Sequence, residues 1–88
     1  MKVYIVKEVK CFNGDEDVTM MAYATEELAM NHLADVKADI LSIVDEAEES
    51  GNSFERDEGK TYYAAWLEGD WFEEHYEVSM EELEVISA

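Results

Sequence analysis

The amino-acid sequence predicts an α+β fold of two layers, with one long helix lying across one face of an antiparallel four-stranded sheet. Three observations indicate this fold. Two pairs of segments alternate like strands, a long segment between the pairs has the spacing of an amphipathic helix, and short turn sequences join the strands of each pair. The predicted order is strand, strand, helix, strand, strand, within a single acidic domain that spans residues 1–88.

The first pair of strands is predicted at residues 2–12 and 18–24. The opening half of the first segment is apolar on both of its faces, which is typical of a central strand. Asn13-Gly14 follows this segment, and Asn-Gly between β-rich segments is a strong indication of a hairpin. Because three acids come next, at 15–17, we expect them to lengthen the loop.

The helix is predicted from Glu26 to Glu49. Thr25 has the hydroxyl of an N-cap residue, which accepts a hydrogen bond from an otherwise unpaired backbone N–H of the first turn. Gly51 is the expected left-handed residue after the last turn. The apolar stripe advances in steps of four and three residues along Ala29, Leu33, Val36, Ile40, Ile43 and Ala47.

The second pair of strands is predicted at residues 60–67 and 71–78, around the turn Glu68-Gly69-Asp70. In the last strand, one face is core-like and the other is strongly acidic. Ser79 with Glu82 three residues later matches a capping box, so we expect one short helical turn after the strand.

The charge balance excludes several classes of function. The chain has 23 acidic and 6 basic residues, for a formal net charge of -17. Each phosphate contact needs a Lys or Arg, so direct nucleic-acid binding is not expected. Anionic membrane surfaces repel such a chain, and no apolar segment is long enough to span a bilayer.

No catalytic, cofactor or metal site is predicted, and we expect a non-enzymatic protein. The acids at 15–17 lack the alternate spacing and following glycine of a calcium loop. Cys11 has neither an orienting group nor a glycine-rich oxyanion loop in the sequence pattern. As a single cysteine it also forms no internal disulfide, which fits a reducing cytoplasm.

The excess of acids suggests an interaction surface, with an ordinary solvated surface as the alternative reading. Carboxylates one helical turn apart lie about 5 to 6 Å from each other, comparable to phosphates along a nucleic-acid strand. On the helix, the candidate partner-binding residues are Asp35, Asp39, Glu46 and Glu49. On the outward face of the second hairpin, they are Tyr63 or Tyr62, Trp71, Glu73, His75 and Glu77.

Three segments carry a resemblance to a known group of proteins: Lys2-Val3-Tyr4-Ile5-Val6, the junction at 23–29 (YATEELA), and the acidic C-terminal hairpin. In layout the chain resembles the small acidic proteins encoded by bacteriophages and other mobile elements. That group includes anti-CRISPR and antirestriction inhibitors that mimic DNA. The resemblance implies an inhibitor of a nucleic-acid enzyme in the host cytoplasm, and it maps no family site residue onto this chain.

The leading expectation is therefore an acidic binding protein that docks onto a basic surface of a partner protein. The alternative is a homo-oligomeric accessory or structural module, such as a homodimer, without a nucleic-acid-related partner. A small hydrolase or metal-dependent enzyme is a third hypothesis, which tight binding of a divalent ion would favour.

Overall fold

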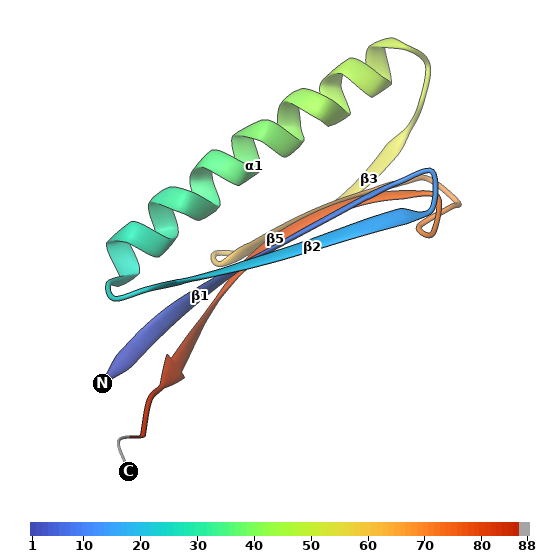
Figure 1. Cartoon of the computed structure of the whole chain (residues 1–88). Coiled ribbons are helices and arrows are strands. Elements are labelled where there is room, and N and C mark those ends of the chain that lie inside the picture. Colours follow the sequence, from blue (N-terminus) through green and yellow to red (C-terminus); the bar gives the residue numbers. More distant parts are fainter. Residues whose placement is uncertain (87–88) are drawn as a thin grey trace.

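One helix covers one face of a five-stranded antiparallel sheet in the computed structural model, which describes residues 1–86 (Figure 1). The elements follow in the order β1 (Lys2–Phe12), β2 (Asp15–Tyr23), α1 (Glu26–Glu49), β3 (Phe54–Glu58), β4 (Tyr62–Leu67) and β5 (Glu74–Glu84). Across the sheet the strand order is β2-β1-β5-β4-β3, so the first and last strands are neighbours inside the sheet. The predicted α+β class and its single helix are confirmed, whereas the predicted number of four strands is wrong.

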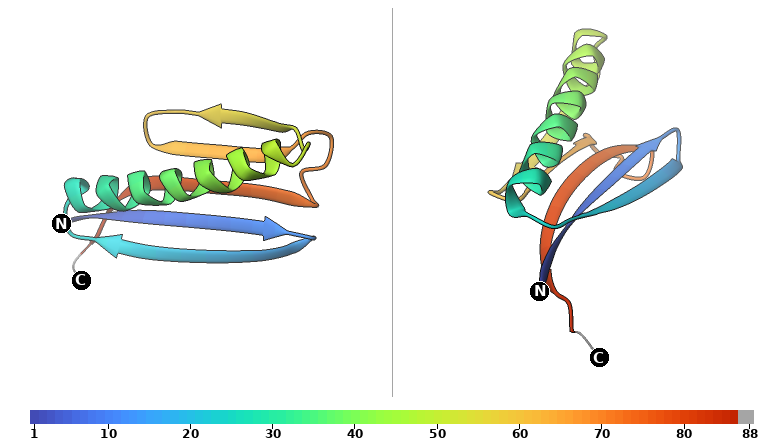
Figure 2. Two further views of the ribbon diagram at one scale, coloured as in Figure 1. Left: turned by 90° about the horizontal axis from the view of Figure 1, so that it is seen from above. Right: turned by 60° about the vertical axis from the view of Figure 1, so that its left-hand side comes forward.

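The two layers leave one face of the sheet open. The helix crosses above β1, β5 and β4, and within residues 1–86 no element covers the opposite side of the sheet (Figure 2). The molecule is elongated, with extents of 52 × 22 × 16 Å. We call the side of the sheet away from α1 the open face.

The β1–β2 hairpin is tighter than the sequence suggests. Asn13 and Gly14 both have positive φ, of 54° and 80°, and Phe12 pairs directly with Asp15. Two central residues with positive φ form the type I′ turn, whose twist matches that of the flanking strands. The acids at 15–17 therefore begin β2 rather than lengthen the loop, and β2 starts three residues earlier than predicted.

The helix has the predicted bounds because both of its ends are capped as the sequence indicates. The Thr25 hydroxyl accepts a hydrogen bond from the backbone N–H of Leu28 at 3.3 Å. At the other end Gly51 has φ of 99°, and the N–H of Asn52 donates to the carbonyl of Ala47 at 3.1 Å. The N–H of Gly51 also donates to the carbonyl of Glu48 at 3.0 Å, which completes a Schellman motif.

The hydrophobic core lies between the helix stripe and the covered side of the sheet. The sheet contributes alternate residues, as strand geometry requires, so neighbours in the sequence have opposite environments. The helix buries Ala29, Leu33, Val36, Ile40 and Val44. They pack against Val6, Phe54, Tyr63, Ala65, Tyr76 and Val78.

The strand that the sequence analysis missed is β3. Its residues Phe54–Glu58 include four charged side chains, which resemble a polar loop when read alone. In the sheet, Phe54 enters the core, while Arg56 and Glu58 pair with Glu48 and Lys37 of the helix. Charged residues are typical of a short edge strand, since they discourage pairing with a further strand.

The last strand also differs from its prediction. β5 spans Glu74–Glu84 instead of residues 71–78, and the helical turn expected after Ser79 is absent from the described chain. Ser79 pairs with Lys7, and Met80 pairs with Val6 while packing against the core. Pairing along the whole of β1 and partial burial of Met80 outweigh one helical turn, because a short helix alone is marginal. No helix in residues 1–86 has the length and apolar character needed to cross a membrane.

Candidate functional site

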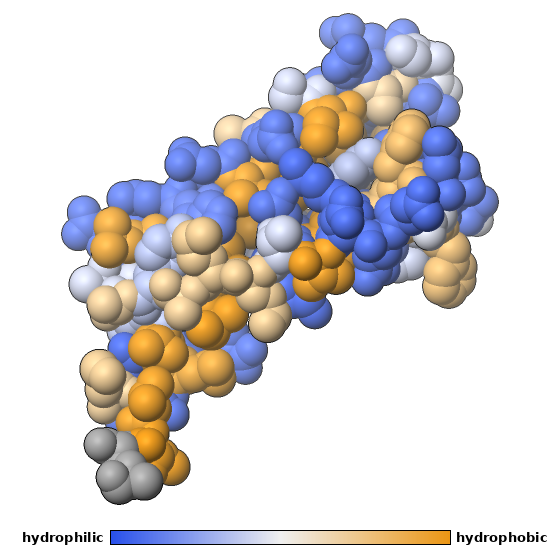
Figure 3. Space-filling model, viewed as in Figure 1, coloured by the Kyte–Doolittle hydropathy of each residue, from blue (hydrophilic) through white to orange (hydrophobic). Residues whose placement is uncertain are grey.

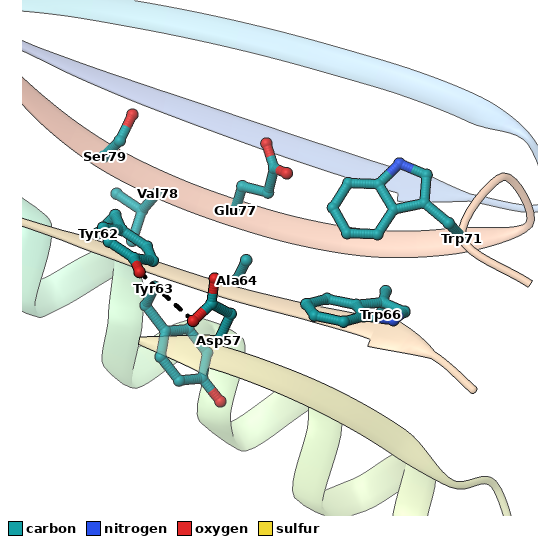
Figure 4. A pocket seen from close by; sticks show the side chains of 9 residues that line it. All are labelled: Asp57, Tyr62, Tyr63, Ala64, Trp66, Trp71, Glu77, Val78 and Ser79. Atoms are coloured by element: carbon teal, nitrogen blue, oxygen red, sulfur yellow. Dashed lines mark hydrogen bonds between the residues drawn. The ribbon is translucent and has the colours of Figure 1, made fainter. Parts of the chain in front are cut away.

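A hollow on the open face brings aromatic and acidic side chains together. Every second residue of β4 faces the open face. These residues are Tyr62, Ala64 and Trp66, so a small side chain lies between two large ones. The small side chain of Ala64 leaves a gap between the two aromatic rings. We call this hollow the notch; it has a volume of about 350 Å³ (Figure 4).

Strand register places one carboxylate on each side of the notch. Ala64 pairs with Asp57 of β3 and with Glu77 of β5, so these three residues form one row across three strands. The next row consists of Glu55, Trp66 and His75. The notch therefore has an alanine floor, aromatic walls at its two ends and an acid on each flank (Figure 4).

At the Trp66 end of the notch, the two indole rings contact each other and Trp71 stacks on His75. Trp71 lies at 5.1 Å from Trp66, with an interplanar angle of 53°, and at 4.4 Å from His75, with an angle of 12°, measured between ring centroids. Trp66 is oriented by its indole N–H, which donates to a Glu55 carboxylate oxygen at 2.8 Å. These interactions hold both indoles in place beside the notch.

His75 is a positioning residue with only 5% of its surface exposed. Its Nδ1 lies 2.7 Å from the backbone carbonyl oxygen of Trp71, and because a carbonyl oxygen only accepts, Nδ1 carries the hydrogen. Its Nε2 lies 3.5 Å from a carboxylate oxygen of Glu16. The ring thus fastens the loop that carries Trp71 onto the sheet.

The loop between β4 and β5 is fixed by local hydrogen bonds. The Asp70 carboxylate accepts from the backbone N–H of Glu73 at 3.2 Å. The Glu73 carbonyl in turn accepts from the N–H of Gly14 at 3.1 Å, which joins this loop to the β1–β2 turn. Glu73 is exposed in the loop and lies outside the residues that line the notch.

Of the hairpin residues predicted for partner binding, the structure brings Trp71, His75 and Glu77 together around Trp66. Tyr63 is a correction: its side chain is 2% exposed and belongs to the core beneath the helix. The outward position that the prediction gave to Tyr63 or Tyr62 is occupied by Tyr62. His75 was expected on the surface, and it is buried because Trp71 folds over it.

The helix acids predicted for partner binding lie in the other layer of the molecule. Asp35, Glu46 and Glu49 are exposed and make no ion pair within the described residues 1–86. Asp39 is exposed too, but it accepts from Lys10 Nζ at 2.8 Å. Because α1 and the open face are on opposite sides of the sheet, these acids and the notch form two separate surfaces.

Sequence reasoning missed three contributors to the notch. Asp57 was not placed because β3 was not predicted. Trp66 and Ala64 were assigned to a strand, but their position relative to Glu77 depends on the pairing of β4 with β5. The large-small-large alternation of residues 62, 64 and 66 is the signal in the sequence that indicates the hollow.

Within residues 1–86, neither Asp57 nor Glu77 beside the notch forms an ion pair with a Lys or Arg. Glu77 is half-buried, and within residues 1–86 it has neither an ion pair nor a side-chain hydrogen bond. Asp57 accepts from the Tyr62 hydroxyl at 3.3 Å, and its negative charge raises the pKa of Tyr62, which stays a neutral donor. The notch is therefore a site of negative potential lined by aromatic rings.

No protein-family model, curated protein or solved structure matches this chain. Within residues 1–86, no three His, Cys, Asp or Glu side chains are arranged to hold a metal ion.

Proposed function

We propose that this protein is a non-enzymatic binding protein that docks onto a basic surface of a partner protein through its open face. One observation carries the proposal: Asp57 and Glu77, two acids without a basic partner within residues 1–86, flank a hollow with tryptophan walls. Tryptophan and tyrosine are the residues on which binding energy concentrates in protein interfaces. Burying unpaired carboxylates is costly unless the partner supplies cations, so a basic surface fits this face.

The net charge of -17 supports the same proposal through kinetics. A strongly charged protein is steered toward an oppositely charged surface, which raises the association rate. Ions screen this steering, since the Debye length falls from about 10 Å at 0.1 M salt to about 3 Å at 1 M. Binding to the partner should therefore weaken as the salt concentration rises.

A narrower form of the proposal makes the partner a nucleic-acid enzyme, with the acids of this chain occupying its phosphate sites. The absence of Lys and Arg after residue 60 supports this form, because no cation interrupts the acidic surface of the C-terminal hairpin. Competition is the direct test. DNA or RNA should displace this protein from such a partner, and a partner that is unaffected by nucleic acid would contradict the narrower form.

The general proposal is tested by affinity capture from a lysate of the source cell, followed by binding measurements with the purified partner. The test variant is Asp57→Asn with Glu77→Gln, and the control is Glu46→Gln with Glu49→Gln, which removes the same charge from the helix. We expect at least about a tenfold weaker affinity at about 500 mM than at about 50 mM salt. We also expect the notch variant to bind less tightly than the helix variant.

Two results would overturn this proposal. An affinity that does not change with salt would remove the electrostatic basis of docking. If the helix variant bound the partner less tightly than the notch variant, the contact surface would be the helix and not the open face.

A specific feature of β2 favours a second candidate, the homo-oligomer. Residues 18–25 are the longest segment of the chain without a charged side chain, and most of them lie in an edge strand. Met20 is 64% and Met21 53% exposed, and Figure 3 shows apolar surface along β2. An exposed segment of an edge strand without charged side chains favours pairing with another strand, here the same segment of a second copy.

The oligomeric state separates the second candidate from the first. Sedimentation at micromolar concentration should show a dimer if β2 pairs with β2 of another copy. Met21→Lys should then give a monomer, because it places a charge on the paired edge. A strict monomer of the unchanged protein would exclude this candidate.

A further inference from the structure

We infer that the notch is a receptor for a single arginine side chain presented by the partner. The inference rests on the proposed function, and it specifies which chemical group of a basic surface is recognised. Its basis is the combination of a hollow, two flanking carboxylates and tryptophan faces at one place on the open face.

The shape of the notch suits one long side chain. Its volume of about 350 Å³ lies above Ala64, between Tyr62 on one side and the two tryptophans on the other (Figure 4). The methyl group of Ala64 sets the depth, because any larger residue there would fill the gap between the neighbouring rings. An extended side chain that enters from solvent therefore meets an aromatic surface at each end of the notch.

The charges favour a cation with several donors. Asp57 and Glu77 are on strands that flank β4, so their Cα atoms are separated by two strand spacings, about 10 Å. The Asp57 side chain reaches toward Tyr62 on one side of the notch, and Glu77 lines the other side (Figure 4). A guanidinium between these strands has five N–H donors to share. Within residues 1–86 Glu77 has no cation partner, although Lys7 of the same sheet face is nearby on β1 opposite Ser79.

The aromatic walls favour arginine over lysine. A guanidinium is planar, stacks on indole faces and is weakly hydrated, whereas an ammonium group is a compact and strongly hydrated charge. The indoles are already fixed, Trp66 by Glu55 and Trp71 by His75, so little ordering is needed when the ligand enters. An uncharged apolar side chain is disfavoured, because it would bury Glu77 without compensating its charge.

The two tryptophans of the chain report on the notch directly, since both line it. The experiment titrates the whole protein with three capped tripeptides, acetyl-Gly-Xaa-Gly-amide, in which Xaa is arginine, lysine or citrulline. We expect a saturable change of tryptophan fluorescence with the arginine peptide, with a Kd on the order of a few millimolar. Lysine should bind several-fold less tightly, and citrulline, which has nearly the shape of arginine without its charge, should not bind.

Matched variants separate the notch from general attraction to an acidic protein. Glu77→Gln keeps the shape of the notch and should weaken arginine binding by about tenfold. Ala64→Leu should abolish binding by filling the hollow, and its circular dichroism spectrum shows whether the fold persists. Glu46→Gln and Glu49→Gln remove the same charge from the helix and should leave the Kd within about twofold.

Several outcomes would overturn the inference. They are an absence of saturable binding, equal binding of citrulline, tighter binding of lysine, or equal weakening by the helix variants. None of these outcomes would contradict the proposed function, which is salt-dependent docking on a basic partner. Conversely, the notch could bind the arginine peptide while the protein has no partner whose binding depends on salt. That result would contradict the proposed function, but it would leave the arginine-binding site in place.

Discussion

Replacing Ile40 by alanine tests whether the helix packs on the sheet through the stripe described above. Ile40 is fully buried, as is Val44 one turn further along the helix. The substitution removes three carbon atoms from this environment. The lost transfer free energy is about 0.8 kcal/mol per carbon, or about 2.4 kcal/mol.

The cavity that remains adds to this loss. Partial collapse around a void of three carbons contributes about 1 to 2 kcal/mol, while the better helix propensity of alanine returns less than about 0.5 kcal/mol. We therefore expect Ile40→Ala to lower the free energy of unfolding by about 3 to 4 kcal/mol. A chain of 88 residues typically has about 4 to 13 kcal/mol in total, so the loss is about a quarter or more of its stability.

Urea unfolding, followed by tryptophan fluorescence and by circular dichroism, measures the change. Ile43→Ala is the matched control, because Ile43 is only half-buried at the side of the same stripe and should cost about half as much. A loss below about 1 kcal/mol for Ile40→Ala, or equal losses for the two variants, would refute the described helix packing.

Other substitutions test the capping, the turn and the buried thiol. Thr25→Ala removes the N-cap of α1 and should lower the unfolding free energy by about 1 kcal/mol. Ser79→Ala lies within β5 and should lower it by less than about 0.5 kcal/mol. Equal losses in urea unfolding would favour a capping role for Ser79. Gly14→Ala should cost about 1 kcal/mol, because the φ of +80° disfavours a Cβ atom; an unchanged melting temperature would contradict the turn geometry. Burial raises the pKa of the Cys11 thiol, so at about pH 8 it should react with a disulfide reagent at least about 100-fold more slowly in the native protein than in urea. Since the unfolded chain loses this proton first, stability should fall as the pH rises above about 8.5, and Cys11→Ala should remove that part of the decline.

The elements that the sequence predicts well are those whose determinants are local. The helix begins at Glu26 and ends at Glu49 as predicted, because Thr25 and Gly51 act within one turn of its ends. The strand at residues 2–12 is confirmed for a similar reason, since its alternation is visible without a partner. In contrast, β3 and the second half of β5 are strands because of what they pair with, and pairing is not visible in the isolated segments.

The candidate site follows the same division. Trp71, His75 and Glu77 were predicted together because they are close in the sequence, and they lie together in the structure. Tyr63 was placed on the wrong side because the face of β4 that meets the helix is fixed by its register with β5. Asp57 joins the site only through sheet pairing.

The two margins of the sheet differ in a way that limits how copies of this chain can assemble. β3 has five residues, four of them charged, whereas the second half of β2 has none. Strand addition is thus expected at the β2 margin and not at the β3 margin, and a twofold pairing through β2 would leave neither molecule with a free β2 edge. If copies of this chain pair through β2, the charged β3 margin therefore favours a closed pair over an open-ended filament.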